Sequence, residues 1–442
     1  MKISIIGLGY VGLPLAVDFA KKGHQVAGID ISPNRIDRLK ACDNYIDDVS
    51  DDDLVSVVKS GLFIASTTFE ACKDSGAVII CVPTPVSEHK DPDLTAIRSA
   101  SEGIAPYVTA GQIVILKSTT FPTTTENVVQ PILERISGMK AGSDFHLAYS
   151  PERVDPGNTK WTTANTPIVV GGLTEECSKK ASELLAEITP NVKIVSSPRV
   201  AELEKLLENI FRSVNIALVN EMAMLCDRMG GVNLWEVVDA AATKPFGFMP
   251  FYPGPGLGGH CIPIDPYYLS WLARKYDFET SFITLSAKTN EQMPFYVVEA
   301  IQRVLANRGS ETVGKPRVLI LGAAFKKNVD DLRHSPAFKI IEVLEQTTST
   351  HVDFCDPHAT EFKKEWLPDN PVMKSIEGTP EQIASYDVVV MVTDHDAFDY
   401  QMVADNARYI VDTRNAFSGI RLPENNIKVL GAGSFLSHEQ KN

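Results

Sequence analysis

The chain has 442 residues, of which 44% are hydrophobic and 22% are charged, and its formal net charge is −14. This length allows two or three domains of ordinary globular composition. The negative charge argues against a nucleic acid partner, and any anionic ligand must be held by local cations or backbone N–H groups. No apolar run approaches the roughly 18 residues of a membrane helix. The seven cysteines show no metal-binding spacing, so we expect free thiols in a cytoplasmic protein.

The N-terminal half predicts a parallel sheet with helices on both faces. A strand at 2–7 is followed by a glycine turn and an amphipathic helix that ends at Gly23, and the next strand ends in Asp30. This alternation of strands and helices is typical of an α/β domain. Further strands are expected at 77–82, 112–116, 145–149 and 167–171.

The middle of the chain predicts helices. Residues 199–229 contain no Gly and no Pro, and apolar residues recur there at spacings of three and four. This pattern predicts one helix of about 30 residues, which links domains or forms a subunit interface. More helix is expected at 265–276 and 281–308, and a second α/β unit begins near Lys315. The architecture is therefore α/β, helical middle, α/β.

The segment GLGYVG at 7–12 fits the G-x-G-x-x-G pattern of dinucleotide-binding turns. It follows a strand, opens a helix and precedes Asp30 at the end of the next strand, and this context makes the pattern specific. Gly7 permits the tight turn, Gly9 lets a pyrophosphate approach, and Gly12 lets helix and strand pack closely. Asp30 would bind the ribose hydroxyls of NAD and repel the extra phosphate of NADP, while nearby Arg35 leaves the use of NADP open.

Two further segments follow predicted strands, CVPTPV at 81–86 and KSTT at 117–120. Ligands of open α/β sheets bind at the carboxyl ends of strands, so Thr84 and Thr119 are expected to face the cofactor. Turn residues and helix caps are the alternative interpretation. The expected cofactor-binding residues are Gly7, Gly9, Tyr10, Val11, Gly12, Asp30, Arg35, Thr84 and Thr119.

A glycine-rich segment, GPGLGGHCIPIDP at 254–266, places Cys261 shortly after a Gly-Gly pair and before Asp265. Glycine loses more backbone freedom on folding than any other residue, so such a turn indicates that something comes close to the backbone. Cys261 is either a nucleophile or a small buried residue. Beside a nicotinamide domain, a thiol suggests oxidation of an aldehyde through a thiohemiacetal and a thioester, which water releases as a carboxylate.

This chemistry also needs a cation for the alkoxide, a base, and a carboxylate that positions water. Lys205 and Asn209 lie on one face of the long predicted helix and would stabilise an oxyanion. Asp265 would act as a base through a water, and Glu152 would orient the hydrolytic water. The alternatives are a solvated lysine at 205 and a glutamate that starts a helix at 152.

In these segments the sequence resembles the UDP-glucose/GDP-mannose dehydrogenase family of NAD-dependent four-electron oxidoreductases. The resemblance covers essentially the whole chain. The shared motifs, in the family's order, are GLGYVGLP, CVPTP, KST, SPER, the Lys205–Asn209 pair, Asn220-Glu221, GGHCIPIDP and GAAFKKNVDDLRHSP. It implies an α/β fold with an N-terminal NAD-binding Rossmann domain at 1–197, a central helical dimerisation and catalytic domain at 198–310, and a C-terminal Rossmann-like domain at 311–442 that binds the UDP-sugar. It also implies a homodimer or higher homo-oligomer, with the active site at the junction of domains.

Carried over by position, the resemblance implies a role for each candidate. Cys261 matches the nucleophile, Lys205 the lysine that stabilises the oxyanion, and Asn209 its helix partner. Asp265 matches an aspartate associated with water and base activation, and Glu152 the carboxylate of the Pro-Glu motif. The implied catalytic residues are Cys261, Lys205, Asp265, Glu152, Asn209 and Thr119, and the implied substrate-binding residues are Glu152, Arg153, Lys205, Asn209, Gly258, Lys326 and Arg333.

The cysteine segment departs from the UDP-glucose enzymes, which tend to have GG-Ser-Cys-Phe-Pro-Lys-Asp. His260, Ile262 and Ile264 replace the serine, phenylalanine and lysine. The preceding stretch has no evident counterpart of the arginine that reaches a neighbouring subunit's substrate, and Lys244 is not assigned to that role. These features resemble the branch that acts on UDP-N-acetylhexosamines, and most of all the UDP-N-acetylglucosamine 6-dehydrogenases of bacterial surface-polysaccharide pathways (O-antigen, capsule). UDP-N-acetylgalactosamine, UDP-N-acetylmannosamine and UDP-glucose stay open, because a few hydrogen bonds read the orientation of one hydroxyl.

Two other functions are weighed against this one. A single-hydride dehydrogenase of the 3-hydroxyacid or 6-phosphogluconate type needs no thiol, and the Cys261 motif and a third domain argue against it. A nucleotide-sugar-binding regulatory paralogue would require the loss of a catalytic residue. A metal site at Asp394-His395-Asp396 is conceivable, but a polar turn after a strand is preferred, since the proposed chemistry needs no metal.

Overall fold

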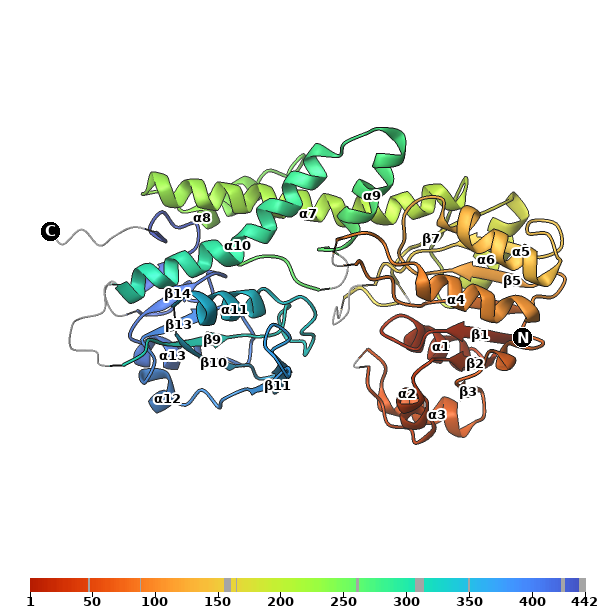
Figure 1. The fold of residues 1–442 in the computed structure, drawn as a ribbon, viewed down its shortest axis with the longest axis horizontal. Coiled ribbons are helices and arrows are strands. Elements are labelled where there is room, and N and C mark those ends of the chain that lie inside the picture. Colours follow the sequence, from red (N-terminus) through yellow and green to blue (C-terminus); the bar gives the residue numbers. More distant parts are fainter. Residues whose placement is uncertain are drawn as a thin grey trace. The chain divides into compact units, whose positions relative to one another are not determined.

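The computed structural model describes residues 1–46, 48–87, 89–154, 160–163, 165–259, 262–306, 314–348, 350–422 and 426–436. The chain forms two compact units (Figure 1). The first unit comprises Met1–Asn209 and Tyr267–Glu279, and the second comprises Ile210–Pro266 and Thr280–Asn442. The three predicted domains, with boundaries at 197/198 and 310/311, stay a prediction.

The sheet of the first unit has eight strands in the order β3-β2-β1-β4-β5-β6-β7-β8. Its strands are β1 (Lys2–Ile6), β2 (Gln25–Ile29), β3 (Phe63–Ser66), β4 (Ala77–Ile80), β5 (Ile113–Leu116), β6 (His146–Tyr149), β7 (Ile168–Gly172) and β8 (Val192–Val195). Its helices and helical turns are α1 (Gly12–Lys21), α2 (Pro33–Lys40), α3 (Asp51–Lys59), η1 (Phe69–Cys72), α4 (Thr95–Ile104), η2 (Ala105–Tyr107), η3 (Thr125–Val129), α5 (Gln130–Ser137) and α6 (Glu175–Leu185).

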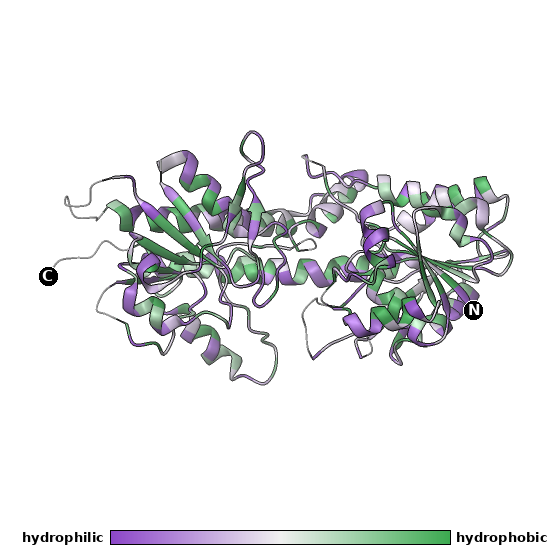
Figure 2. Ribbon diagram, turned by 90° about the horizontal axis from the view of Figure 1, so that it is seen from below, coloured by the Kyte–Doolittle hydropathy of each residue, from purple (hydrophilic) through white to green (hydrophobic). Residues whose placement is uncertain are grey.

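The central strands of this sheet are apolar on both faces. All four residues of β4 and of β5 are buried, as parallel strands covered by helices require. Figure 2 shows these strands in green, between helices that also carry hydrophilic residues. This core fixes the carboxyl ends of β1, β4 and β5, which is where the sequence places its cofactor residues.

The sheet differs from the sequence prediction at its edges. Strands β3 and β8 are not predicted, because each lies at an edge of the sheet and neither is a continuous buried run. Strands β6 and β7 pair antiparallel, while the prediction is a parallel sheet. The connection at 150–167 contains no helix among its described residues, and parallel neighbours need a crossover connection, usually a helix.

The predicted helical middle is confirmed. Helix α7 (Pro198–Met229) has 32 residues and contributes to both compact units. It is followed by α8 (Leu234–Ala242), α9 (Asp265–Ala273), the turn η4 (Arg274–Tyr276) and α10 (Ser281–Ala306). Among the described residues, none of the helices combines the length and the apolar character that crossing a membrane requires.

The second unit contains a five-stranded parallel sheet in the order β10-β9-β13-β14-β15 and a small antiparallel pair, β11-β12. This confirms the second α/β unit predicted from Lys315 onward. Its elements are β9 (Arg317–Leu321), α11 (Pro336–Thr348), β10 (His351–Cys355), β11 (Glu361–Lys363), β12 (Val372–Lys374), α12 (Pro380–Ala384), β13 (Val388–Met391), α13 (Tyr400–Asn406), β14 (Ile410–Asp412) and β15 (Ile427–Val429).

Candidate active site

The three glycines between β1 and α1 are glycines for different reasons. Gly7 has φ +90°, and an added Cβ there would lie 2.7 Å from the Cys81 carbonyl oxygen. A Cβ at Gly12 would lie 1.8 Å from the carbonyl oxygen of Gly7, so helix and strand could not pack. A Cβ at Gly9 would meet no protein atom within 4 Å. The protein itself therefore requires Gly7 and Gly12, whereas Gly9 keeps open the space that a pyrophosphate would occupy.

Asp30 closes this turn from the end of β2. Its Oδ2 accepts the N–H of Leu8 at 2.9 Å, and its Oδ1 accepts the N–H of Ser32 at 2.9 Å. The Arg35 guanidinium donates to Oδ2 at 3.2 Å, so this cation is paired with the acidic residue. Tyr10 and Val11 complete the turn, and Tyr10 is exposed. The N-terminus of α1 and the Asp30 carboxylate fit the phosphates and a ribose of NAD.

The segments after β4 and β5 lie beside each other. The Ser118 hydroxyl donates to the Val82 carbonyl oxygen at 2.7 Å. Thr84 is buried, and its carbonyl oxygen accepts the Tyr268 hydroxyl. Thr119 is half-buried in the loop after β5. Both threonines thus stand at the carboxyl edge of the strands.

Glu152 is held by a cation that sequence reasoning did not single out. The Lys117 ammonium lies 3.1 Å from Glu152 Oε2 and donates to the Pro151 carbonyl oxygen at 3.2 Å. Oε1 of Glu152 accepts the N–H groups of Arg153 at 2.9 Å and Val154 at 2.8 Å. Burial would raise the pKa of Glu152, but Lys117 and the hydrogen bond from Val154 hold it below the ordinary value. Glu152 is therefore a carboxylate at neutral pH and does not start a helix.

Lys205 and Asn209 are not solvated residues of helix α7. Each is only 9% exposed, which excludes the interpretation of Lys205 as an ordinary surface charge. The Lys205 ammonium is close enough to Glu152 to contribute to the lowered pKa of that carboxyl. α7 thus carries a cation near the Glu152 carboxylate and, one turn further on, a buried amide, and the oxyanion hypothesis needs both of these groups.

Arg153, a predicted substrate-binding residue, is engaged by two carboxylates of α7. Its guanidinium pairs with Glu208 and lies 3.6 Å from Glu204. Burial and the neighbouring Glu208 raise the pKa of Glu204 to about 7, whereas Arg153 lowers the pKa of Glu208 against the effect of burial. In this structure Arg153 anchors the Glu152 loop to the helix, and its contact with substrate stays a prediction.

Glu202 is a second residue that sequence reasoning missed. It is fully buried one turn before Lys205 and accepts the N–H groups of Thr123 at 2.6 Å and Thr125 at 2.8 Å. Burial raises its pKa to about 7. Thr123 has φ +86°, a backbone conformation that needs such support. Glu202 therefore ties the loop that follows Thr119 to α7.

In the second unit, buried amides fix the segment that leads to Cys261. Asn220 Oδ1 accepts the N–H of Gly254 at 2.9 Å, and Asn220 Nδ2 donates to Asn290 at 3.0 Å. Asn290 donates in turn to the Ser213 carbonyl oxygen at 3.0 Å. The Asn220-Glu221 motif thus has a structural reason. Cys261 and its neighbour His260 lie outside the described residues.

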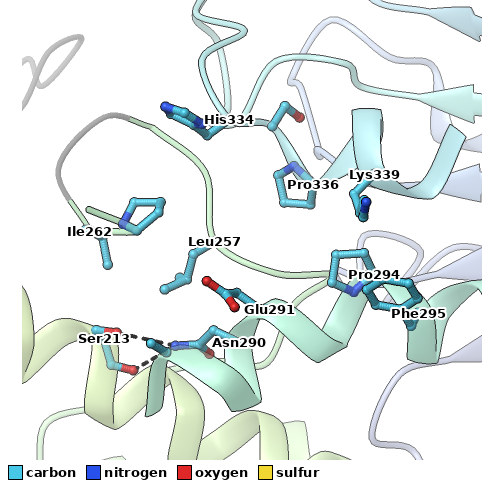
Figure 3. Close-up of a pocket in the computed structure, with 13 residues that line it drawn as sticks. Ser213, Leu257, Ile262, Asn290, Glu291, Pro294, Phe295, His334, Pro336 and Lys339 are labelled. Carbon is cyan, nitrogen blue, oxygen red and sulfur yellow. Dashed lines mark hydrogen bonds between the residues drawn. The ribbon is translucent and has the colours of Figure 1, made fainter. Parts of the chain in front are cut away.

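A cavity of about 300 Å³ opens beside this segment, within the second unit. Ile262 and Pro263, which directly follow Cys261, contribute to its lining. Figure 3 shows Asn290 and Glu291 of α10 on one side of the cavity and His334 on the other.

Asp265, the predicted base, is the first residue of α9 and is 2% exposed.

Three predicted substrate-binding residues lie in the second unit. A Cβ at Gly258 would lie 2.4 Å from Cβ of Phe325, so packing within the protein already requires glycine there. Arg333 pairs with Asp331, with Nε–Oδ1 at 2.9 Å. Lys326 is half-buried between β9 and α11. Their contact with a nucleotide sugar stays a prediction.

The Asp394-His395-Asp396 segment is taken up by protein contacts. His395 is fully buried, with Nε2 3.1 Å from Asp356 Oδ2 and Nδ1 accepting the N–H of Asn328 at 2.9 Å. The Lys327 ammonium lies 2.6 Å from Asp396 and 3.7 Å from Asp394. In the described part of the chain, histidine, cysteine and acidic side chains form no group that would hold a metal ion.

Family models match most of the chain. The NAD binding domain of the UDP-glucose/GDP-mannose dehydrogenase family matches residues 1–189, its central domain matches 199–292, and its UDP binding domain matches 319–419. The match to the NAD binding domain covers the glycine turn, Asp30, Thr84, Thr119 and Glu152. NAD is therefore the cofactor of the first unit.

Relatives of known activity match over nearly their whole length. A UDP-N-acetyl-D-glucosamine 6-dehydrogenase of Pseudomonas aeruginosa is 36% identical over 412 residues, 92% of this chain and 93% of that protein. A UDP-N-acetyl-D-mannosamine dehydrogenase of Escherichia coli K12 is 34% identical over 430 residues, 94% and 99% of the two chains. The solved structure of a UDP-D-ManNAc dehydrogenase from Pyrococcus horikoshii is similar at a TM-score of 0.86 and 31% identity, covering 98% of this chain and all of that one. The chain belongs to the UDP-glucose/GDP-mannose dehydrogenase family and is an NAD-dependent UDP-sugar dehydrogenase.

Proposed function

We propose that the enzyme oxidises carbon 6 of a UDP-N-acetylhexosamine to the uronic acid, with UDP-N-acetylglucosamine as the substrate. The observation that carries the reaction is the cluster of Lys117, Glu152 and Lys205 at the cofactor edge of the first unit, with Asn209 buried one turn further along α7. The substrate class is supported by the relatives, whose names specify N-acetylated hexosamines. The overall reaction is RCH₂OH + 2 NAD⁺ + H₂O → RCOO⁻ + 2 NADH + 3 H⁺.

The proposed steps use this chain's own side chains in sequence. Lys205 and Asn209 hold the alcohol oxygen as its proton leaves, and the Cys261 thiolate then adds to the carbonyl carbon to give a thiohemiacetal. NAD, when bound, accepts the hydride in each of the two oxidations. In the last step a water molecule, oriented by Glu152, forms a bond to the thioester carbon while the C–S bond breaks, which returns Cys261 as a thiolate. Asp265 serves as a base through a water.

Two of the other thiols are poor candidates for the nucleophile. Cys42, Cys72, Cys81, Cys177, Cys226 and Cys355, the six cysteines within the described residues, are free. Burial raises the pKa of Cys72 to about 11 and that of Cys81 to about 12, so neither is a thiolate at neutral pH. Free thiols also support a reducing cytoplasmic location.

The test is the NADH yield from limiting UDP-sugars, with mass analysis of the product. Two NADH per UDP-N-acetylglucosamine and a product with COOH in place of CH₂OH are expected. Two NADH from UDP-glucose or another N-acetylhexosamine alone would overturn the choice of substrate. One NADH from any sugar would return the assignment to a single-hydride dehydrogenase. Cys261→Ala is expected to abolish acid formation and to keep NAD binding.

We also propose a homodimer built on α7. The helix carries an exposed apolar stripe with the three- and four-residue spacing of one helix face. The stripe comprises Val200, Leu203, Leu207, Phe211, Leu218, Met222, Leu225 and Met229. A second copy of the chain is the partner that the family resemblance implies. Leu218→Glu is expected to give a monomer by light scattering, whereas Lys179→Glu on α6 leaves the dimer intact. A monomeric wild-type enzyme would contradict this assembly.

A further inference from the structure

The two side chains of the Lys117–Glu152 ion pair differ in their exposure to solvent, and an ion pair with only a structural role does not require such a difference. The side chain of Lys117 is 2% exposed, whereas that of Glu152 is 22% exposed. Lys117 follows β5 and Glu152 follows β6, and these strands are parallel neighbours in register at Leu116 and Tyr149. The cation is therefore sealed in the fold, and the carboxylate is the partner that faces outward.

Both oxygens of Glu152 are restrained. Two backbone N–H groups, from Arg153 and Val154, donate to Oε1, and the Lys117 ammonium contacts Oε2. The same ammonium donates to the carbonyl oxygen of Pro151, the residue before Glu152, so it holds both the backbone and the carboxylate of this loop. A carboxylate offers about four acceptor positions, and these contacts leave room for a water on its exposed side.

Other charged or titratable groups also interact electrostatically with Glu152. Lys205 of α7 contributes a second favourable charge, and Lys117 contributes the larger effect. Cys81, after β4, and Asp18, on α1, are protonated more readily because of the Glu152 charge, and for both groups burial is the main cause of the raised pKa. Lys117 is therefore the group on which the ionisation of Glu152 chiefly depends.

We propose that Lys117 is a positioning residue, which keeps Glu152 ionised and aimed at the water that hydrolyses the thioester. This inference rests on the function proposed above. Burying an ammonium at the end of an apolar strand is costly unless the charge is paired. Here the partner of the ammonium is Glu152, which lies at the cofactor edge of the sheet. Lys117 contacts no reacting atom in this scheme, so its effect passes entirely through Glu152.

The first test compares the wild-type enzyme with Glu152→Gln, using kcat between pH 6 and 9. If Glu152 stays ionised, the two pH profiles are parallel in this range, and the variant is lower by roughly 10²-fold. A limb between pH 6 and 8 that is present in the wild type and absent from Glu152→Gln would overturn the proposal. This comparison does not depend on any change at Lys117.

The second test compares Lys117→Met with Lys117→Arg. Lys117→Met is expected to gain an acid limb, with kcat falling about tenfold per pH unit once Glu152 protonates, and to accumulate acyl-Cys261 visible by mass spectrometry. Lys117→Arg keeps the charge and the wild-type profile shape. A loss of equal size at every pH in Lys117→Met would show a merely structural role and overturn the proposal.

A double variant keeps the test decisive if Lys117→Met alone does not fold. Lys117→Met/Glu152→Gln buries no unpaired carboxylate, and it is expected to differ from Glu152→Gln by less than about threefold in kcat. A larger further loss would mean that Lys117 acts through another group. The NADH yield separates this result from the proposed function. A wild-type yield below two per sugar refutes the function, while a yield of two with a Lys117→Met profile parallel to that of the wild type refutes only the role of Lys117.

Discussion

A methyl group at Gly9 is expected to weaken NAD binding without weakening the fold. No protein atom lies within 4 Å of the position that its Cβ would take, and the φ of Gly9 is outside the left-handed region. Gly→Ala at such a site stabilises a protein by about 0.4–1 kcal/mol through the unfolded chain. The same methyl group occupies the space that a pyrophosphate would use, so Gly9→Ala should raise the Kd for NAD at least about tenfold, or ~1.4 kcal/mol.

Gly12→Ala is the matched control. Its Cβ would lie 1.8 Å from the carbonyl oxygen of Gly7, so the backbone must shift and the free energy of unfolding should fall by about 2–4 kcal/mol. Calorimetric titration with NAD and urea unfolding separate the two variants. At an NAD concentration of 100 times the wild-type Kd, the stabilisation by ligand should fall from about 2.7 kcal/mol to about 1.4 kcal/mol in Gly9→Ala. Wild-type affinity in Gly9→Ala would refute the reasoning.

Three further predictions concern buried polar groups. The pKa of Glu202 is about 7 in the folded protein, above its ordinary value of 4.5, so ionisation of Glu202 destabilises the fold as the pH rises through this interval. In urea unfolding, the stability of Glu202→Gln relative to the wild type should therefore increase by about 2–3 kcal/mol between pH 5 and 8. A stability difference that does not change with pH would contradict this. Asn220→Ala leaves the Gly254 N–H unpaired and should cost about 1–3 kcal/mol, measured by urea unfolding with Asn215→Ala on the same helix as the control. Asp356→Ala removes five acceptor contacts and should cost about 3–5 kcal/mol; a loss below 1 kcal/mol would contradict the assigned contacts.

The sequence was sufficient for the parts of the site that local pattern determines. The glycine turn, Asp30, and the long helix with Lys205 and Asn209 follow from spacing within one strand or one helix, and the structure has them where the spacing indicates.

The partners of these residues could not be predicted in the same way. Lys117 and Pro151 are 34 positions apart, Arg153 and Glu208 are 55 apart, and Glu202 and Thr125 are 77 apart. Lys117 and Pro151 meet because β5 and β6 are neighbouring strands, and the other two pairs meet because segments that follow these strands contact α7. No periodicity within one segment predicts such contacts. The edge strands β3 and β8 were missed for a related reason, since an edge strand lacks the buried run that makes a central strand visible.

Each unit has an aspartate at the end of a strand, and the two aspartates make different contacts. Asp30 accepts two backbone N–H groups and the Arg35 guanidinium, which leaves an acceptor position for a ribose hydroxyl. Asp356, at the end of β10, accepts four backbone N–H groups and contacts His395, and its side chain is fully buried. A carboxylate has about four acceptor positions, so Asp356 has none left for a ligand. Asp30 thus keeps one acceptor position that a cofactor ribose would use, whereas all acceptor positions of Asp356 are taken by the protein. We therefore expect NAD to bind only to the first unit.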